Sequence, residues 1–189
     1  FTGDESAKVW TEQMAAVETA RREDARRRTA ALRATLSEQG VESIVYATRP
    51  IHQDGHWYAN ISYYAEDVNR KTYRKGTGLY VLDMASGERL TLVEDPEGTI
   101  RDPAVDYDGS RILFSWRKGG TEHFHLYTIN ADGSELKQLT AGGYDDIEGA
   151  WLPDGGIVFV SSRSRRWVNC WLTQVATIHR CDADGANIE

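Results

Sequence analysis

The sequence predicts a mainly β fold: a partial β-propeller of about three four-stranded antiparallel blades, the last incomplete, preceded by a long N-terminal α-helix. Three observations lead to this prediction. Residues 97–140 contain four short apolar runs separated by turn signals, parts of this unit recur on both sides of it, and the N-terminal segment has a helix-forming composition instead. We expect the helix in residues 1–40 and the propeller segment in residues 41–189.

The N-terminal segment is predicted to be helical from its composition and from its end. It is rich in Ala, Arg, Glu and Leu and has no proline, and Gly40 stands where a C-terminal cap belongs. We predict a helix from about Glu5 to Gln39, with Asp4 or Thr2 as its N-cap.

Charged residues interrupt the apolar stripe of this helix between Arg21 and Arg28. Glu18 with Arg22 and Asp24 with Arg28 are four residues apart, a spacing at which mutual pairing supports a solvated helix surface. A patch for phosphate or anionic lipid is the alternative, although the interleaved acids reduce its field. We expect the two apolar ends of the helix to dock on this chain or on a neighbour.

The first blade, residues 41–94, is expected to be irregular. Ser43–Thr48 and Trp57–Tyr64 are typical of strands because β-branched and aromatic residues dominate both. A histidine-containing loop joins them, residues 66–75 are expected to form a polar loop, and the next strand begins at Leu79.

The second blade, residues 97–140, is the most complete unit. Its apolar runs are short and rich in β-branched and aromatic residues, and Asp-Gly or Gly-Gly turns end them, which is the signal for hairpins. The four runs are 102–109, 111–116, 123–130 and 135–140.

Parts of the second blade recur at a regular distance along the chain. Residues 148–155 repeat residues 102–109 at an offset of 46, and residues 79–92 match residues 126–139 at an offset of 47. Repeats of about 40 to 50 residues with four strands each predict a β-propeller or a related array.

The third blade, residues 143–189, has a longer loop between its second and third strands. Residues 182–185 repeat residues 130–133 at an offset of 52, so this loop has gained about six residues. The sequence stops where the outermost strand of the blade begins.

A closed propeller needs at least about four blades, and this sequence has fewer than three complete ones. Open blade faces and unpaired strand edges are an aggregation hazard. We therefore expect the ring to be completed by the remainder of a longer chain or by a protein partner. Phe1 is not a start methionine, which suggests that a leader or a longer N-terminus has been removed.

Composition excludes several classes of partner. The 189 residues are 40% apolar and 27% charged, and the net charge of −7 disfavours a nucleic-acid partner, which requires a basic surface. No run approaches the roughly 18 consecutive apolar residues of a membrane span. The two cysteines, Cys170 and Cys181, allow one disulfide, and a pair of reduced thiols is the alternative.

Two blade segments carry the resemblance to a known family. Residues 103–109 and the run Ala150-Trp151-Leu152-Pro153-Asp154-Gly155 resemble the blade signature of TolB-like and WD-repeat-like propellers. Residues 144–185 are similar to the middle propeller domain of hydrazine synthase alpha subunits and their homologues in planctomycete-type bacteria. The resemblance covers residues 41–189, and its most specific part is Trp167-Val168-Asn169-Cys170-Trp171.

The resemblance to hydrazine synthase alpha subunits implies a haem site to which a cysteine of the middle domain contributes. The corresponding position here is Ser164, which removes that ligand. Haem chemistry within these residues is therefore in doubt.

Two histidine pairs are candidate metal ligands. His52, Asp54 and His56 lie within one loop at a spacing that can wrap a metal, and a solvated polar loop is the alternative. His123 and His125 alternate on one strand and so face the same side, where Glu122 can join them. Strand alternation also produces this pattern without any metal.

A charged set lies at the starts of the second and third blades. Since the first strand of each blade lines the channel of a propeller, we expect these side chains to converge near one mouth of the channel, where they could bind a cation or a polar ligand. The alternative is that they bond to neighbouring backbone and lock blade to blade. The residues are Arg101, Asp102, Asp145, Asp146 and Glu148.

The long loop of the third blade combines aromatic and guanidinium side chains, which suits a platform for a sugar, a cofactor edge or a protein partner. The alternative is that its tryptophans fold back over the blade. The platform residues are Arg163, Arg166, Trp167, Asn169 and Trp171.

Catalytic and attachment motifs are absent from the sequence. It has no Gly-x-Ser-x-Gly elbow, no Cys-x-x-Cys-His haem attachment motif and no phosphate-binding glycine loop. We expect no cofactor within these residues and a non-catalytic scaffold for ligand binding or protein assembly, in a periplasmic or otherwise extracytoplasmic bacterial protein. The alternative is the propeller portion of a multihaem oxidoreductase similar to hydrazine synthase, with haem c outside these residues. A sugar-binding lectin that uses Trp167 and Trp171 is a third function.

Overall fold

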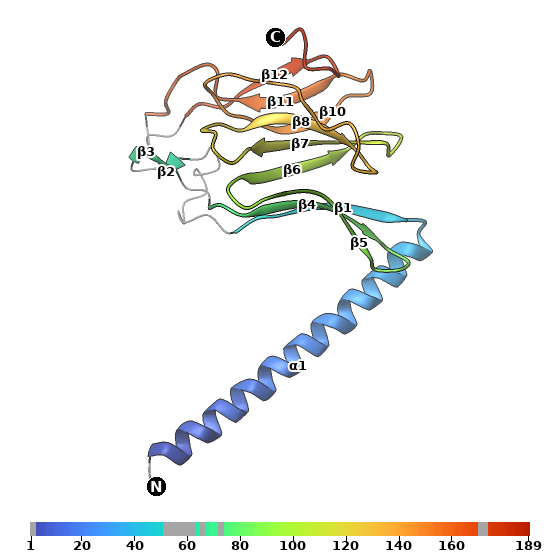
Figure 1. Cartoon of the computed structure of the whole chain (residues 1–189), viewed down its shortest axis with the longest axis vertical. Coiled ribbons are helices and arrows are strands. Elements are labelled where there is room, and N and C mark those ends of the chain that lie inside the picture. The colour runs from blue at the N-terminus through green and yellow to red at the C-terminus, as the bar shows by residue number, and fades with distance from the viewer. Residues whose placement is uncertain (1–2, 51–62, 65–66, 72–73, 170–173) are drawn as a thin grey trace. The chain divides into compact units, whose positions relative to one another are not determined.

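The computed structural model describes residues 3–50, 63–64, 67–71, 74–169 and 174–189 of the chain. The chain divides into two compact units: Phe1–Ile44 with Asp83–Glu88, and Val45–Leu82 with Arg89–Glu189. The predicted fold class is confirmed, since one N-terminal helix precedes antiparallel sheets in the described residues (Figure 1).

The helix α1, Gly3–Glu38, forms most of the first unit. It ends as predicted: Gly40 adopts a φ of 80°, and its amide donates a 3.0 Å hydrogen bond to the Ser37 carbonyl oxygen. Asp4 lies inside the helix and is therefore not its N-cap, and Thr2 lies outside the described residues. Among the helices of the described residues, none combines the length and apolar character needed to cross a membrane.

The last turns of α1 are tied to the turn Asp83–Glu88 of the same unit. The Arg33 guanidinium donates hydrogen bonds to the carbonyl oxygens of Met84 at 3.0 Å and Ala85 at 3.3 Å. The Met84 amide in turn donates to the Glu42 carbonyl oxygen at 2.9 Å. These bonds connect the end of the helix to residues more than forty positions away.

Blade 2 is the complete four-stranded sheet that the sequence predicts. Its strands are antiparallel and pair in chain order: β6 (Thr99–Val105), β7 (Arg111–Arg117), β8 (His125–Asn130) and β9 (Lys137–Gln138). Along β7, Ile112, Leu113 and Phe114 are all buried although successive residues point to opposite faces. Blade 2 is therefore covered on both faces.

Blade 1 is a three-stranded sheet in the described residues, with the order β1 (Ser43–Thr48), β4 (Thr77–Asp83) and β5 (Arg89–Asp95). The repeat offset aligns β4 and β5 with β8 and β9, so β1 takes the place of the second strand of a blade.

The chain between β1 and β4 differs from the sequence prediction. The strands β2 (Tyr63–Tyr64) and β3 (Asp67–Lys71) form a separate two-stranded ribbon. The expected polar loop at residues 66–75 was therefore wrong in part. Its backbone pairs with β2, and backbone pairing needs no apolar run. Most of the expected strand at residues 57–64 lies outside the described residues.

Blade 3 contains β10 (Asp146–Trp151), β11 (Ile157–Ser161) and β12 (Thr177–Cys181), paired antiparallel in that order. Glu189 exchanges two 3.0 Å backbone hydrogen bonds with Arg180, which places the final residue in the position of a fourth strand.

Blades 1 and 2 pack face to face through an apolar cluster. Leu79 and Val93 of blade 1 meet Ile112, Phe114 and Tyr127 of blade 2. A second apolar cluster joins blades 2 and 3 and contains Leu113, Leu126, Trp151, Ile157 and Phe159 (Figure 1). We call the side of a blade that meets the following blade its forward face, and the opposite side its rear face.

The blades share two local features, a left-handed residue at a bulge in the first strand and a pair of rings on the rear face. Asp102 and Glu148, 46 residues apart, both adopt the left-handed conformation, at φ 55° and 57°, where β6 and β10 bulge. The rear face of each blade also carries two neighbouring rings. The pairs are Tyr46 with Tyr80, Phe114 with Tyr127, and Phe159 with His179, at centroid distances of 5.4, 5.9 and 5.9 Å.

The two ends of the blades differ in their connections. The links from second to third strand all lie at one end, here called the loop rim, and are residues 49–76, 118–124 and 162–176. The other end has tight Asp-Gly turns at Asp108-Gly109, Asp132-Gly133, Asp154-Gly155 and Asp184-Gly185. Since Thr99 pairs with Arg117 and Asp146 with Ser161, the first strands of blades 2 and 3 begin at the loop rim.

Candidate functional site

The predicted channel-mouth residues lie at the loop rim in two groups. In the first group, the Nε of the buried Arg101 lies 2.5 Å from the Asp102 Oδ2, and its Nη2 lies 3.0 Å from the Glu148 Oε1. The Glu148 amide donates a 3.2 Å hydrogen bond to the Asp102 Oδ2. Asp102 and Arg101 therefore tie the first strand of blade 2 to that of blade 3.

Arg49, which the sequence analysis did not single out, adds a second cation to this group. Partial burial and the neighbouring Arg101 charge lower the pKa of Arg49, whereas Asp102 raises it. Arg49 and Arg101 thus supply two positive charges to the group that contains the carboxylates of Asp102 and Glu148. Because these charges balance, the group offers little net field for a free cation and suits a polar, neutral partner better.

The second group centres on the buried carboxylates of Asp145 and Asp146. The Asp145 Oδ1 accepts a 2.8 Å hydrogen bond from the Phe124 amide of blade 2, and the Asp145 amide donates to the Ser162 Oγ at 2.9 Å. The Asp146 Oδ1 accepts a 2.9 Å hydrogen bond from the Arg163 Nη2. Buried carboxylates are costly without such partners.

His123 and His125 face these two carboxylates. Their Nδ1 atoms lie 3.6 Å from the Asp145 Oδ1 and 3.7 Å from the Asp146 Oδ2, which is beyond hydrogen-bond length. Burial raises the pKa of Asp146, but its interactions with His125 and with neighbouring hydroxyl and guanidinium groups outweigh this effect and hold the pKa below 3.8. No set of three or more potential metal ligands comes together among the described residues.

The structure divides the predicted platform. Arg163 turns inward and is largely buried: its guanidinium lies over the ring of Tyr144 at 4.7 Å and pairs with Asp146. Arg166 and Asn169 remain exposed, and Trp167 is 43% exposed.

Several predicted residues lie outside the part of the chain that the structure describes. They are His52, Asp54, His56, Cys170 and Trp171. The metal site in the first loop and the disulfide between Cys170 and Cys181 therefore stay predictions. Cys181 itself is buried, and burial raises the pKa of its thiol to about 11. Ser164, where the resemblance implies a cysteine, donates a 3.4 Å hydrogen bond to the Val175 carbonyl oxygen.

Asp95, which was not predicted as a site residue from the sequence, accepts more hydrogen bonds than any other carboxylate of the described residues. Its Oδ1 accepts hydrogen bonds from the amides of Glu97 and Gly98, and its Oδ2 accepts them from the Trp116 indole and the Gly119 amide, at 2.7–3.0 Å. Asp95 thereby ties the last strand of blade 1 to blade 2. The sequence feature that could have identified Asp95 is the turn Asp-Pro-Glu-Gly that it begins. An aspartate at the start of a turn accepts hydrogen bonds from the amides that follow it.

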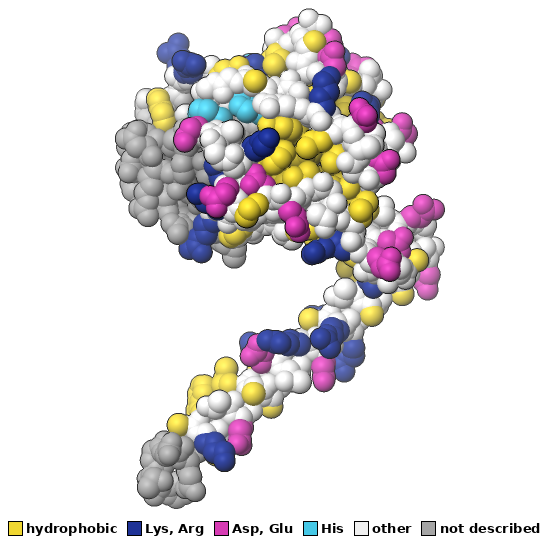
Figure 2. Space-filling model, in the orientation of Figure 1, with side chains coloured by type: hydrophobic (Ala, Val, Ile, Leu, Met, Phe, Trp, Pro, Cys, Tyr) yellow, Lys and Arg dark blue, Asp and Glu magenta, His cyan; other side chains and the backbone are white. Residues whose placement is uncertain are grey.

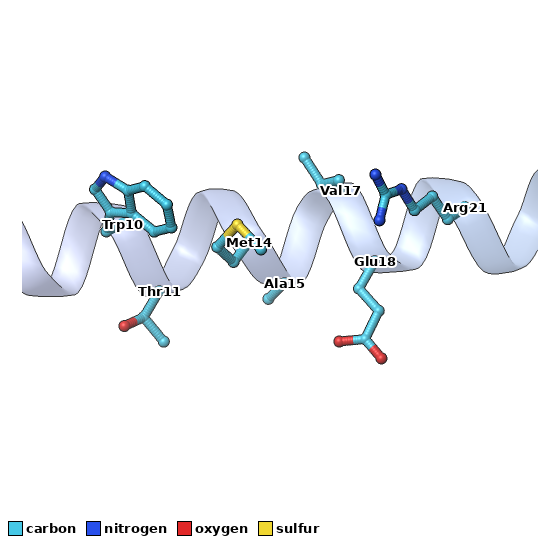
Figure 3. Close-up of a pocket in the computed structure, with 7 residues that line it drawn as sticks. All are labelled: Trp10, Thr11, Met14, Ala15, Val17, Glu18 and Arg21. Carbon is cyan, nitrogen blue, oxygen red and sulfur yellow. The ribbon is translucent and has the colours of Figure 1, made fainter. Parts of the chain in front are cut away.

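The helix α1 carries a separate apolar surface. Figure 3 shows Trp10, Met14 and Val17 along one side of the helix, with Arg21 next to them. These apolar side chains are exposed and form the yellow patch near the N-terminal end of α1 in Figure 2. The Glu18–Arg22 pair that the sequence predicts is present, at 2.5 Å.

Comparisons with known proteins agree with this architecture. No family model matches the chain. The Tol-Pal system protein TolB of Francisella tularensis subsp. tularensis is 30% identical over 89 residues, which are 47% of this chain and 20% of that protein. Hydrazine synthase of Kuenenia stuttgartiensis superposes with a TM-score of 0.53 over 74% of this chain and 20% of its own, at 14% identity.

The chain resembles TolB-like β-propellers. The structure of a putative TolB of Agrobacterium tumefaciens superposes on this chain with a TM-score of 0.48 and 25% sequence identity. The superposition covers 60% of this chain and 40% of the Agrobacterium chain. The match to the Francisella protein confirms the predicted resemblance to TolB, and the superposition on hydrazine synthase confirms the second resemblance, at 14% identity as one of fold alone. The match spans a fifth of the length of the curated TolB relatives.

The polar groups of this TolB-like segment mostly hold blades together. The carboxylates of Asp95, Asp102 and Asp145 each accept a hydrogen bond from an adjoining blade. The hydroxyl oxygens of Ser161 and Ser162 accept hydrogen bonds from Arg163 and from the Asp145 amide. Such bonding is typical of structural polar groups, and among the described residues of the loop rim Arg166, Trp167 and Asn169 remain exposed.

Proposed function

We propose that the chain is part of a non-catalytic, TolB-like propeller scaffold that binds a protein partner in an extracytoplasmic compartment of a bacterium. One contrast at the loop rim carries this proposal. The channel-side carboxylates of Asp102 and Asp145 accept hydrogen bonds between blades, whereas the side chains of Arg166 and Asn169 are exposed and that of Trp167 is 43% exposed. An exposed tryptophan beside a guanidinium is typical of the residues that dominate protein interfaces.

The TolB relatives support the partner and the compartment in this proposal. Their name assigns those proteins to the Tol-Pal system, and the similarity extends over 89 residues of this chain. The scaffold works as a ring, which further blades complete, either from the remainder of a longer chain or from a protein partner. The unmatched faces of blades 1 and 3 support this part of the proposal.

Site-specific photo-crosslinking in the native bacterium tests the partner surface. With a photoreactive phenylalanine in place of Trp167, we expect an adduct of one defined mass that weakens several-fold when Arg166→Glu is added. Leu136 is the matched control position, because it is 48% exposed against 43% for Trp167 but lies at the edge of blade 2. Equal adducts at both positions, or none at position 167, would contradict the proposal.

The alternative of a multihaem oxidoreductase is tested on the native protein by its absorption spectrum. The scaffold proposal expects no Soret band in the purified protein that contains this segment. A Soret band would contradict the scaffold proposal and support the redox enzyme.

The lectin alternative requires glycan binding that Trp171→Ala abolishes. Release of the protein by osmotic shock tests the extracytoplasmic compartment.

A further inference from the structure

The long loop of blade 3 is held in shape by backbone pairing between its two sides. Trp167 and Gln174 form an antiparallel bridge, and the Val175 amide donates a 2.8 Å hydrogen bond to the Arg166 carbonyl oxygen. The backbone of residues 165–167 is therefore fixed in the unbound chain. A surface that is ordered before binding loses less conformational entropy when a partner docks on it.

Two neighbouring arginines of this loop carry unpaired positive charges. Arg165 and Arg166 are both exposed, and neither guanidinium pairs with a carboxylate of the described residues. Arg163 differs from them, because it pairs with Asp146 at 2.9 Å. Since the chain has a net charge of −7, the two unpaired cations create a local positive field on an acidic protein.

Trp167 adds apolar area next to the two cations. Its side chain is 43% exposed, whereas Trp116 and Trp151 in the blade strands are 7% and 8% exposed. Tryptophan and arginine are the residue types that most often dominate the binding energy of protein interfaces. We call residues 165–167 the arginine–tryptophan surface.

We propose that the arginine–tryptophan surface binds an acidic segment of a protein partner. Aspartate or glutamate carboxylates of that segment pair with Arg165 and Arg166, and an apolar side chain beside them packs on the Trp167 ring. Hydrogen bonds between guanidinium and carboxylate groups are charge-assisted, and the planar guanidinium matches the geometry of a carboxylate. This inference rests on the proposed function, because it names the chemistry of the partner that the scaffold binds.

A protein segment fits this surface better than a nucleic acid does. Nucleic-acid binding needs an extended row of cations that contact successive phosphates, and the net charge of −7 opposes it. The arginine–tryptophan surface offers two cations, which suits a short acidic stretch. The exposed part of the Trp167 side chain then contacts the apolar neighbours of the acidic residues.

Photo-crosslinking from the facing side of the loop tests the acidic partner. A photoreactive phenylalanine in place of Ala176, which is exposed and follows Val175, leaves the whole surface intact. In the native bacterium we expect an adduct whose partner peptide, identified by mass spectrometry, contains neighbouring Asp or Glu residues. Arg165→Gln combined with Arg166→Gln should weaken the adduct about tenfold, because charged hydrogen bonds are lost. Lysine at both positions keeps the charge and should weaken it less.

A matched control separates the loss of these contacts from a general loss of charge. Arg180 is also an exposed arginine of blade 3, but it pairs with Asp154 at 2.7 Å. Arg180→Gln should therefore leave the adduct unchanged. Because Arg165 and Arg166 are exposed, their variants should keep the circular dichroism and the melting temperature of the natural protein.

A synthetic peptide with the crosslinked sequence then measures the contribution of its charges. It should bind the native protein that contains this segment, and replacement of its Asp and Glu by Asn and Gln should weaken binding about tenfold. Equal affinity of the two peptides would overturn the acidic partner, as would an adduct with a segment that lacks acidic residues, with nucleic acid or with lipid. No adduct at position 176 would also overturn it. Only the further absence of an adduct at position 167 would contradict the scaffold proposal, so the two failures are distinguishable.

Discussion

At the scale of single residues, the carboxylate of Asp95 makes the sharpest prediction. Asp95→Asn should lower the free energy of unfolding by about 1–3 kcal/mol, because an amide nitrogen cannot accept and two of the four donors lose their partner. Urea denaturation measures the change. Asp132→Asn makes the same substitution in an exposed turn and should cost less; equal losses in the two variants would contradict this role for Asp95.

The same residues predict how stability depends on pH. Burial raises the pKa of both Asp95 and Asp146, but hydrogen bonds hold each below 3.8 in the folded protein. Groups of this kind stabilise the fold fully above their unfolded pKa, and the contribution is lost as the pH falls through the lower folded values. Stability should therefore decline between about pH 5 and pH 2, and Asp95→Asn should flatten the decline. An unchanged slope in that variant would exclude Asp95 as a source.

Some residue roles follow from local sequence and others do not. Gly40 is predictable as a helix cap because the cap depends on neighbours in the chain. The inward orientation of the Arg163 side chain is not predictable from its neighbours in sequence. It depends on contacts with Asp146 in β10 and with Tyr144, which precedes that strand. The bonding of Asp102 to blade 3 is one of the two roles that the sequence predicts for the charged set, and ligand binding is the other.

At the scale of elements, the contact between blades 2 and 3 depends on a glycine. A Cβ atom at Gly149 would lie 2.8 Å from the Cδ2 of Leu113, so the first strand of blade 3 approaches blade 2 closely there. Gly149→Ala should destabilise the protein by about 1–3 kcal/mol through overpacking.

Thermal unfolding measures the effect of this substitution against a glycine with free space. At Gly143 the nearest atom to an added Cβ is 3.7 Å away, so Gly143→Ala should leave the melting temperature almost unchanged. If Gly149→Ala left the melting temperature unchanged, the two blades would be able to move apart at this point without loss of stability, which would contradict the prediction.

The strands of blade 2 are predictable because each is a short apolar run between strong turn signals. The strand β3 is not, because a polar segment pairs there through its backbone alone. The strand β11 follows a turn that is one residue shorter than the turn before β7, so the repeat offset changes from 46 at Gly155 to 45 at Ile157, and Ile157 stays on the rear face.

At the scale of the whole molecule, the number and order of the blades follow from the repeat, since each unit carries its own strands and turns. What completes the ring does not follow, because the faces that meet there come from distant segments or from another chain. The candidate site is likewise predictable only in part. The sequence places its charges at the starts of first strands, but only packing decides that Asp102 bonds to the next blade.

The difference between the two ends of the blades has a consequence for evolution and for engineering. Links at the loop rim range from residues 118–124 to residues 49–76 between equivalent strands, whereas the opposite turns of blades 2 and 3 keep their Asp-Gly pairs. Lengthening therefore accumulates at one end without disturbing the strands. That end is where new binding specificities can arise in descendants of this sequence, and where a foreign peptide is best grafted at residues 118–124 for display.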